Sequence, residues 1–203
     1  MRVDQHSLSR SALTATARVA RRAFFDDPFF TFLLPPDRVR TKGLTIFFRS
    51  VLAHTGPKGR VVTERSEEDV IIGIAAGLTT GGYPLSIGTQ LTQLPSSIRA
   101  FAHQPWQLAV GNAYVQTVAK AHPKEPLWYL LLCNEPPVQH FGVGTLLLEK
   151  GFAHIDARGV ASYLETQKGE NIPYYRRFGY ELRETLRPVP SGAPIYTMWR
   201  SPR

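Results

Sequence analysis

The sequence predicts an α/β fold with a mixed, mostly antiparallel sheet flanked by helices, in one compact domain. Apolar residues at helical spacing dominate the N-terminal part, and short apolar runs typical of strands then alternate with helical segments. Proline and glycine separate these segments. The 203 residues, 43% hydrophobic and 11% aromatic, are enough for one sizeable core.

Two helices are predicted before the first strand. Ser9 or Ser11 can cap a helix whose apolar positions follow helical spacing, and the sequence DDP at 26–28 ends it. A second helix is predicted to begin at Asp37, after two prolines, and to end near Gly56 and Pro57.

Two strands are predicted next, at 61–65 and 69–78. The second is almost wholly apolar, which is typical of an interior strand. Residues 85–121 have helical spacing interrupted at Pro95 and Pro105.

The C-terminal part repeats the alternation of strands and helices. We predict a strand at 127–133, a loop at 134–137, a helix that ends at Gly159, a strand at 161–166, a short helix closed by Gly179, and final strands at 180–186 and 195–200.

Composition narrows the possible partners. The chain has 24 Lys and Arg against 16 Asp and Glu, a net charge of +8, which favours polyanions such as nucleic acid or a phosphorylated cofactor. No basic run with interleaved aromatic residues is present, so we expect no nucleic acid as a partner.

A single cysteine, Cys133, excludes an internal disulfide and a zinc–cysteine cluster, and we expect no metal. We expect a cytoplasmic protein with no membrane partner, because no apolar run is long enough for a span or a signal core.

The segment QHFGVG at 139–144 stands between the predicted strand at 127–133 and the helix that follows. Glycines at such a junction let backbone N–H groups approach an anion closely, and the helix dipole favours negative charge there. Leu147 replaces the third glycine of a dinucleotide fingerprint, and no Gly-Lys-Ser/Thr is present, so both of those phosphate motifs are excluded. A diphosphate site or a simple tight turn into a helix remains.

The surrounding residues resemble the GNAT acyltransferase superfamily. Gln139 to Gly144 are similar to its Q/R-x-x-G-x-G/A pyrophosphate motif, and YLETQKGENIPYYRRFGYE at 163–181 is similar to its second cofactor segment. With HPKEPLWYL at 122–130 and a closing strand near MWR, the likeness is to puromycin N-acetyltransferase and similar small actinobacterial antibiotic-type acetyltransferases.

The resemblance implies a sheet splayed between the strands that contain Leu127 and Ala161, with acyl-coenzyme A in the gap. Residues 127–200 would form the acyl-CoA-binding core, and the N-terminal helices with 85–121 would shape the acceptor pocket. The edge near Leu131 to Cys133 would pair with the pantetheine amides. The implied cofactor-binding residues for acetyl-CoA are Leu131, Cys133, Gln139, Phe141, Gly142, Val143, Gly144, Thr145 and Asn171.

Tyr175 is the candidate catalytic residue, as the proton donor to the departing thiolate, because a phenol stays protonated at neutral pH. The alternative is that Tyr174 or Tyr175 only packs the helix on the sheet. Asn171 could bind the cofactor or cap its helix. A lone cysteine in a strand is usually inert core, so a covalent role for Cys133 is not favoured.

The general base is left open between Glu125, Glu64, His122 and solvent. Asp26 and Asp27 could attract a cationic acceptor, although a solvated helix terminus is the favoured interpretation. Glu165 and Thr166 end a strand beside the implied cleft, where a backbone contact is favoured over side-chain chemistry.

The predicted function is therefore N-acetyl transfer from acetyl-CoA to an amine of a small molecule, by a monomer or homodimer. A catalytically silent acyl-CoA-binding sensor is the alternative, and a basic nucleic-acid binder is a third hypothesis.

Overall fold

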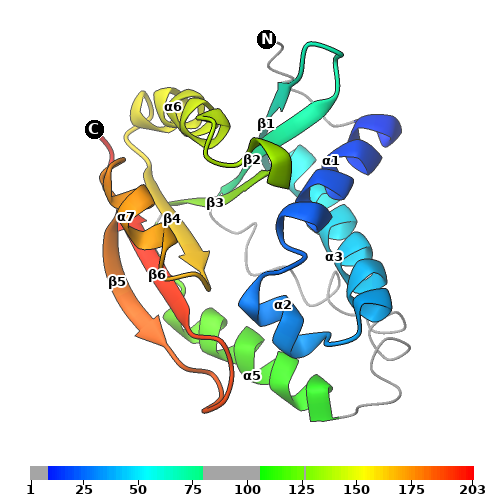
Figure 1. Ribbon diagram of the computed structural model, residues 1–203. Coiled ribbons are helices and arrows are strands. Elements are labelled where there is room, and N and C mark those ends of the chain that lie inside the picture. The colour runs from blue at the N-terminus through cyan, green and yellow to red at the C-terminus, as the bar shows by residue number, and fades with distance from the viewer. Residues whose placement is uncertain (1–8, 80–105, 126) are drawn as a thin grey trace.

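The computed structural model describes residues 9–79, 106–125 and 127–203. Within them, six strands form one sheet in the order β1-β2-β3-β4-β6-β5 (Figure 1). The β3–β4 pair is parallel and the other neighbours are antiparallel. The strands are β1 (Gly59–Arg65), β2 (Ile71–Thr79), β3 (Leu127–Asn134), β4 (Ala161–Thr166), β5 (Glu181–Leu186) and β6 (Ile195–Arg200). The mixed, mostly antiparallel sheet is confirmed, and the apolar β2 lies inside it as predicted.

Helices cover both faces of the first half of the sheet. α1 (Arg10–Ala23) and α3 (Asp37–Lys58) pack on one face of β1 to β3, and α6 (Val143–Asp156) packs on the other (Figure 1). α7 (Asn171–Arg176) packs near β5, and a 3-10 turn, η1 (Pro136–Val138), joins β3 to the loop before α6. None of the helices in the described ranges is long and apolar enough to cross a membrane.

Local signals explain the starts of α1 and α3. Ser9 caps α1, since its side chain accepts a hydrogen bond from the N–H of Ala12 at 3.2 Å. α3 begins at Asp37 as predicted, whereas α6 ends at Asp156 and a turn carries the chain to Gly159 at a φ of 62°. The prediction for 85–105 lies outside the described residues.

One short helix, α2 (Pro28–Leu33), was not predicted from the sequence. Asp27 caps it and Pro28 is its first residue, an arrangement that suits the fixed φ of proline and its missing N–H. The sequence DDP therefore ends one helix and begins another.

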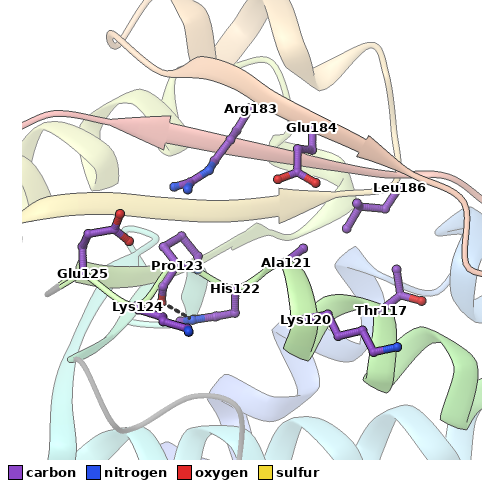
Figure 2. A pocket seen from close by; sticks show the side chains of 10 residues that line it. All are labelled: Thr117, Lys120, Ala121, His122, Pro123, Lys124, Glu125, Arg183, Glu184 and Leu186. Carbon is purple, nitrogen blue, oxygen red and sulfur yellow. Dashed lines mark hydrogen bonds between the residues drawn. The ribbon is translucent and has the colours of Figure 1, made fainter.

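α5 (Trp106–Ala121) lies beneath the β6–β5 end of the sheet. Tyr114 and Val118 on α5 pack with Ile195 on β6, and the Tyr114 hydroxyl donates to the carbonyl of Ala193 at 2.6 Å. The last turn of α5 faces β5 across a small pocket of about 520 Å³ (Figure 2).

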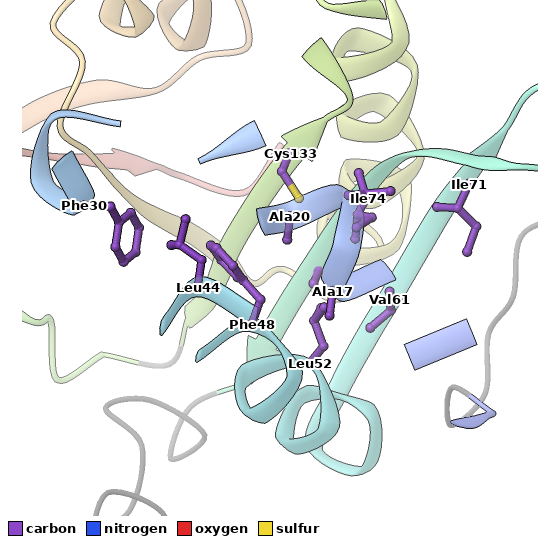
Figure 3. Packing of buried hydrophobic residues seen from close by; sticks show 12 residues of the cluster. Ala17, Ala20, Phe30, Leu44, Phe48, Leu52, Val61, Ile71, Ile74 and Cys133 are labelled. Atoms are coloured by element: carbon purple, nitrogen blue, oxygen red, sulfur yellow. The ribbon is translucent and has the colours of Figure 1, made fainter. Parts of the chain in front are cut away.

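Besides the small cluster under α5, the described core has two larger layers, one on each face of the sheet. The layer under α1 and α3 contains Ala17, Leu44, Phe48 and Leu52 from the helices, with Ile74 from β2 (Figure 3). The layer under α6 contains Leu147, Leu148, Phe152 and Ile155, together with Tyr175 and Tyr180. Alternation along β3 follows from the strand period of two, since Leu130 faces the α6 layer and Leu131 and Cys133 face the other.

Candidate functional site

The sheet splits between β3 and β4. The two strands pair only from Leu127 to Tyr129 against Ala161 to Tyr163. Beyond that point β3 stays paired with β2 as far as Asn134, and β4 stays paired with β6 as far as Thr166. The facing edges of β3 and β4 therefore do not pair with each other, and the split implied by the resemblance is present at the predicted strands.

A cleft of about 1510 Å³ opens at this split. The ends of β3 and β4, the loop before α6, α7 and parts of α1, α2, α3 and α5 line it. Of the cofactor-binding and catalytic residues predicted from the sequence, those that line the cleft are Leu131, Cys133, Gln139, Gly142, Gly144, Thr145, Asn171 and Tyr175. Phe141 and Val143 do not line it: the Phe141 side chain is 80% exposed, and Val143 packs against the α6-side core.

The loop before α6 turns sharply to present the helix N-terminus to the cleft. Gly142 has a φ of 84°, and His140 has a φ of 69°, a conformation that is strained for a residue with a side chain. Among the residues that the structure describes, the N–H groups of Gly142, Val143 and Thr145 make no hydrogen bond. These are open donors at the positive end of a 14-residue helix.

The N–H group of Gly144 is engaged within the protein, although the position of Gly144 in the motif suggests a contact with the diphosphate. In the amide orientation that satisfies both ends of the side chain, Asn134 donates to the carbonyl of Cys133 (3.0 Å) and accepts from the N–H of Gly144 (3.3 Å). A Cβ on Gly144 would lie 2.7 Å from the hydroxyl oxygen of Tyr174. The glycine is therefore required by close packing, and its N–H is engaged by a side chain.

Tyr175 lies where β3, α6 and α7 meet. It is 8% exposed, packs edge-on against Tyr174 and Tyr180, and lines the cleft. Burial is the main reason that the pKa of Tyr175 is raised above the usual value for tyrosine, and the nearby Cys133 adds to the effect. The hydroxyl is therefore protonated at neutral pH.

Tyr174 packs on the first turn of α6, against Gly144. Burial is the main reason that the pKa of Tyr174 is raised above the usual value for tyrosine. The two tyrosines thus occupy different places, with Tyr174 beside the helix terminus and Tyr175 within the α6-side core.

Asn171 does not cap its helix, so that alternative was wrong. Glu170 holds the cap position of α7 without a side-chain bond, and Asn171 is the first helical residue. Its Nδ2 donates instead to Oγ1 of Thr166 at 3.0 Å, which ties α7 to the end of β4. Gln139 makes a longer contact, since its Nε2 donates to the carbonyl of Asn134 at 3.4 Å.

Cys133 lies in the core beside α1 and α3 (Figure 3). Burial raises the pKa of its thiol well above the usual value, and the charge of Glu135 adds to this effect. A thiol held protonated in this way is a poor nucleophile, as expected for an inert core cysteine.

The side chain of Glu165, for which a backbone contact is favoured from the sequence, is a further candidate for proton transfer. It lies on β4 in the wall of the cleft, and its Oε2 accepts a hydrogen bond from the Tyr129 hydroxyl at 3.3 Å. Burial raises the pKa of Glu165 to about 7, against the lowering effect of Tyr163 and Tyr129. The other residues of β4 are buried, and a glutamate is rare among buried residues. Its presence in this short apolar strand is the feature of the sequence that points to a functional side chain.

The three base candidates chosen from the sequence do not line the cleft. His122 and Glu125 line the smaller pocket between α5 and β5, where Nδ1 of His122 lies 2.8 Å from the carbonyl of Pro123 (Figure 2). Burial lowers the pKa of His122. Glu64 lies on β1, which is separated from the split by β2 and β3.

Asp27 contradicts the interpretation of residues 26–27 as a solvated helix terminus. Asp26 is exposed, but Asp27 is 4% exposed and lines the cleft. Its Oδ1 accepts from the N–H of Phe29 at 3.0 Å, and burial raises its pKa. The burial of Asp27 is not evident from the sequence because it depends on the packing of α2 against α5.

No protein-family model matches the chain. Among solved structures, it is similar to "histone acetyltransferase HPA2 and related acetyltransferase" from Corynebacterium glutamicum, with 23% identity over 100% of this chain and 98% of that one, at a TM-score of 0.72. It is also similar to arylalkylamine N-acetyltransferase 2 from Aedes aegypti, with 12% identity over 100% of both chains, at a TM-score of 0.64.

A third similar structure is a GNAT superfamily phosphinothricin acetyltransferase from Sinorhizobium meliloti, solved in complex with AcCoA. The identity is 12% over 99% of this chain and 89% of that chain, at a TM-score of 0.57. The chain therefore has the fold of the GNAT acetyltransferases.

Proposed function

We propose that the protein is an acetyl-CoA-dependent N-acetyltransferase that acts on a small-molecule amine. The observation that carries the proposal is the split between β3 and β4, which has open N–H donors of α6 on its wall and both Glu165 and Tyr175 in the same cleft. Two of the similar structures were solved with coenzyme A or AcCoA bound, which supports acyl-CoA as the donor.

The binding residues fit a diphosphate-containing donor. The open N–H groups of Gly142 and Thr145, two residues that line the cleft, would bind the diphosphate, since Gly144 is engaged by Asn134. The unpaired edge of β3 from Leu131 to Cys133 would bind the pantetheine amides as an added strand. The positive net charge of +8 would attract the anionic donor.

Glu165 and Tyr175 would divide the proton transfers. When bound, acetyl-CoA supplies the activated acyl group as a thioester. Glu165, whose pKa burial raises to about 7, would accept the proton that the amine nitrogen loses on attack. Tyr175 would donate from its hydroxyl to the sulfur as the carbon–sulfur bond breaks. Its raised pKa keeps it protonated and makes it a weak acid, so its main contribution is hydrogen bonding to the developing charge.

The acceptor side would be formed by α1, α2, α3 and α5, with residues 127–200 as the acyl-CoA-binding core. The likeness of 122–130 and 163–181 to puromycin-type enzymes makes an antibiotic or another xenobiotic amine the first acceptor class to test.

The test is a thermal shift with acetyl-CoA, followed by a thiol-release assay with an amine panel that includes puromycin. Acetyl-CoA should raise the melting temperature, because a ligand that binds only the native state stabilises it. Thiol release should depend on the amine. A thermal shift without amine-dependent release would favour the acyl-CoA sensor, and no shift at all would overturn acyl-CoA binding.

A further inference from the structure

Asp27 places a buried carboxylate on the wall of the large cleft. Its side chain makes one backbone hydrogen bond, from the N–H of Phe29, and within the described ranges it forms no ion pair. The charged group that acts on it is Lys168, from the loop after β4, at more than ion-pair distance. Buried carboxylates are normally paired with a cation, so this one has capacity for a positively charged ligand.

The surroundings of Asp27 are apolar. Phe24, Phe29, Phe30 and Leu33 line the same cleft near α2, and the Phe29 ring contacts that of Tyr114 with centroids 4.6 Å apart. Farther along the wall, side chains of α3 and α5 remain substantially exposed: Ile46 (42%), Phe47 (37%), Leu108 (38%) and Val115 (45%). Exposed apolar side chains that share one cavity indicate an apolar ligand.

Both features belong to the cleft that holds Glu165 and Tyr175. The split between β3 and β4, with the open N–H groups of α6, is the part that suits acyl-CoA. The wall formed by α1, α2, α3 and α5 is left for the acceptor. A cation held at Asp27 is therefore held in the reaction cavity.

We infer that Asp27 binds the ammonium group of the acceptor, and that the acceptor is a hydrophobic amine, with one cationic nitrogen on an aromatic or alkyl body. This inference rests on the proposed function and names its substrate class. Asp27 acts in binding, because a carboxylate stabilises the ammonium form and lowers the concentration at which the amine fills the cleft. Removal of the proton is left to Glu165.

The alternative is that Asp27 serves only as the cap of α2. Asp27→Asn separates the two roles, because asparagine caps helices as well as aspartate does and carries no charge. Asp27→Ser is a second uncharged capping variant, for use if the first does not fold. Asp26→Asn is the matched control, since it makes the same change at the exposed neighbouring residue.

The experiment measures steady-state kinetics with 2-phenylethylamine and with ethanolamine, which has the same ammonium group without the apolar body. The wild type should have at least about tenfold higher kcat/KM for 2-phenylethylamine, as expected for burial of an aromatic ring. Asp27→Asn should raise KM for 2-phenylethylamine by roughly 10- to 100-fold, with kcat changed by less than about threefold and KM for acetyl-CoA unchanged. Asp26→Asn should match the wild type.

An unchanged KM in Asp27→Asn, or equal use of the two amines by the wild type, overturns the inference while acyl transfer itself stands. If the wild type turns over no amine, the proposed function fails, and Asp27 is tested by calorimetric titration with coenzyme A present. The cation site is then supported if the wild type binds 2-phenylethylamine but not its neutral analogue 2-phenylethanol, and if Asp27→Asn no longer binds the amine. Equal binding of the two compounds by the wild type overturns it.

Discussion

The Tyr129 hydroxyl on β3 donates to Oε2 of Glu165 on β4, at 3.3 Å, beside the point where the two strands stop pairing. Tyr129 belongs to the last β3–β4 pair, and Glu165 lies just beyond it along β4. The bond therefore bridges the start of the split and holds the carboxyl group in the cleft wall. Because burial outweighs this bond, Glu165 titrates near neutral pH.

If Glu165 is the base, turnover at saturating amine should fall as pH drops below about 7, because the carboxylate becomes protonated. Glu165→Gln should lower kcat by about 10²- to 10⁴-fold, and the fall of kcat on the acidic limb of the pH profile should disappear. Tyr129→Phe removes a bond that favours the ionised form, so the limb should move to higher pH. A limb near pH 7 that survives in Glu165→Gln would assign it to another group.

Tyr175→Phe should lower kcat by about tenfold or more while binding of acetyl-CoA, followed by thermal shift, stays close to that of the wild type. The ring and its packing against Tyr180 are retained, so the loss reports the hydroxyl alone. Tyr174→Phe is the matched control on the same helix. Equal losses in the two variants would indicate a packing effect rather than proton donation.

The sequence predicted those parts of the fold that depend on local signals. Ser9 marks the start of α1, and the apolar run of β2 marks an interior strand. α2 was missed because six residues are too few to show helical periodicity. The pKa of Glu165 was not predictable because it depends on burial and on two tyrosines, one of them from β3.

In the candidate site, too, the sequence predicted the features that depend on neighbouring residues and not those that depend on tertiary packing. The glycine motif located the start of α6 and its open N–H groups, because the helix terminus follows directly in the sequence. It did not indicate that Asn134 and Tyr174 occupy the space around Gly144, since both are brought there by other elements. The burial of Asp27 is not predictable from the sequence for the same reason, because it depends on tertiary packing.

Gly144→Ala should destabilise the protein by about 1–3 kcal/mol, because the new methyl group would meet the Tyr174 hydroxyl oxygen at 2.7 Å. Gly151→Ala, on the same helix with no atom within 4 Å of the added Cβ, should instead be neutral or stabilising by up to about 1 kcal/mol. Denaturant titration of both variants makes the comparison. Adding Tyr174→Phe to Gly144→Ala should restore part of the lost stability. If the double variant is no more stable than Gly144→Ala, the Tyr174 hydroxyl is not the group that clashes with the new methyl group.

Asp156→Asn should destabilise the protein at pH 7 by about 2–3 kcal/mol, because it leaves the buried guanidinium of Arg200 without its anion. In the wild type, Nη1 and Nη2 of Arg200 each donate to one carboxylate oxygen of Asp156 at 2.7 Å, which joins the end of α6 to β6. These bonds lower the pKa of Asp156, so their stabilisation is present above the pKa of an unfolded aspartate, about 3.9, and is lost as pH falls through the lowered folded value.

The measurement for this pair is denaturant unfolding at pH 7 and at low pH, with Glu149→Gln as the control because Glu149 is an exposed carboxylate on the same helix. The difference in the free energy of unfolding between the wild type and Asp156→Asn should become smaller at low pH, where the wild-type carboxylate also loses its charge. Glu149→Gln should change the free energy of unfolding by less than about 0.5 kcal/mol at both pH values. A loss in Asp156→Asn that is the same at both pH values would mean that the ion pair contributes nothing beyond packing.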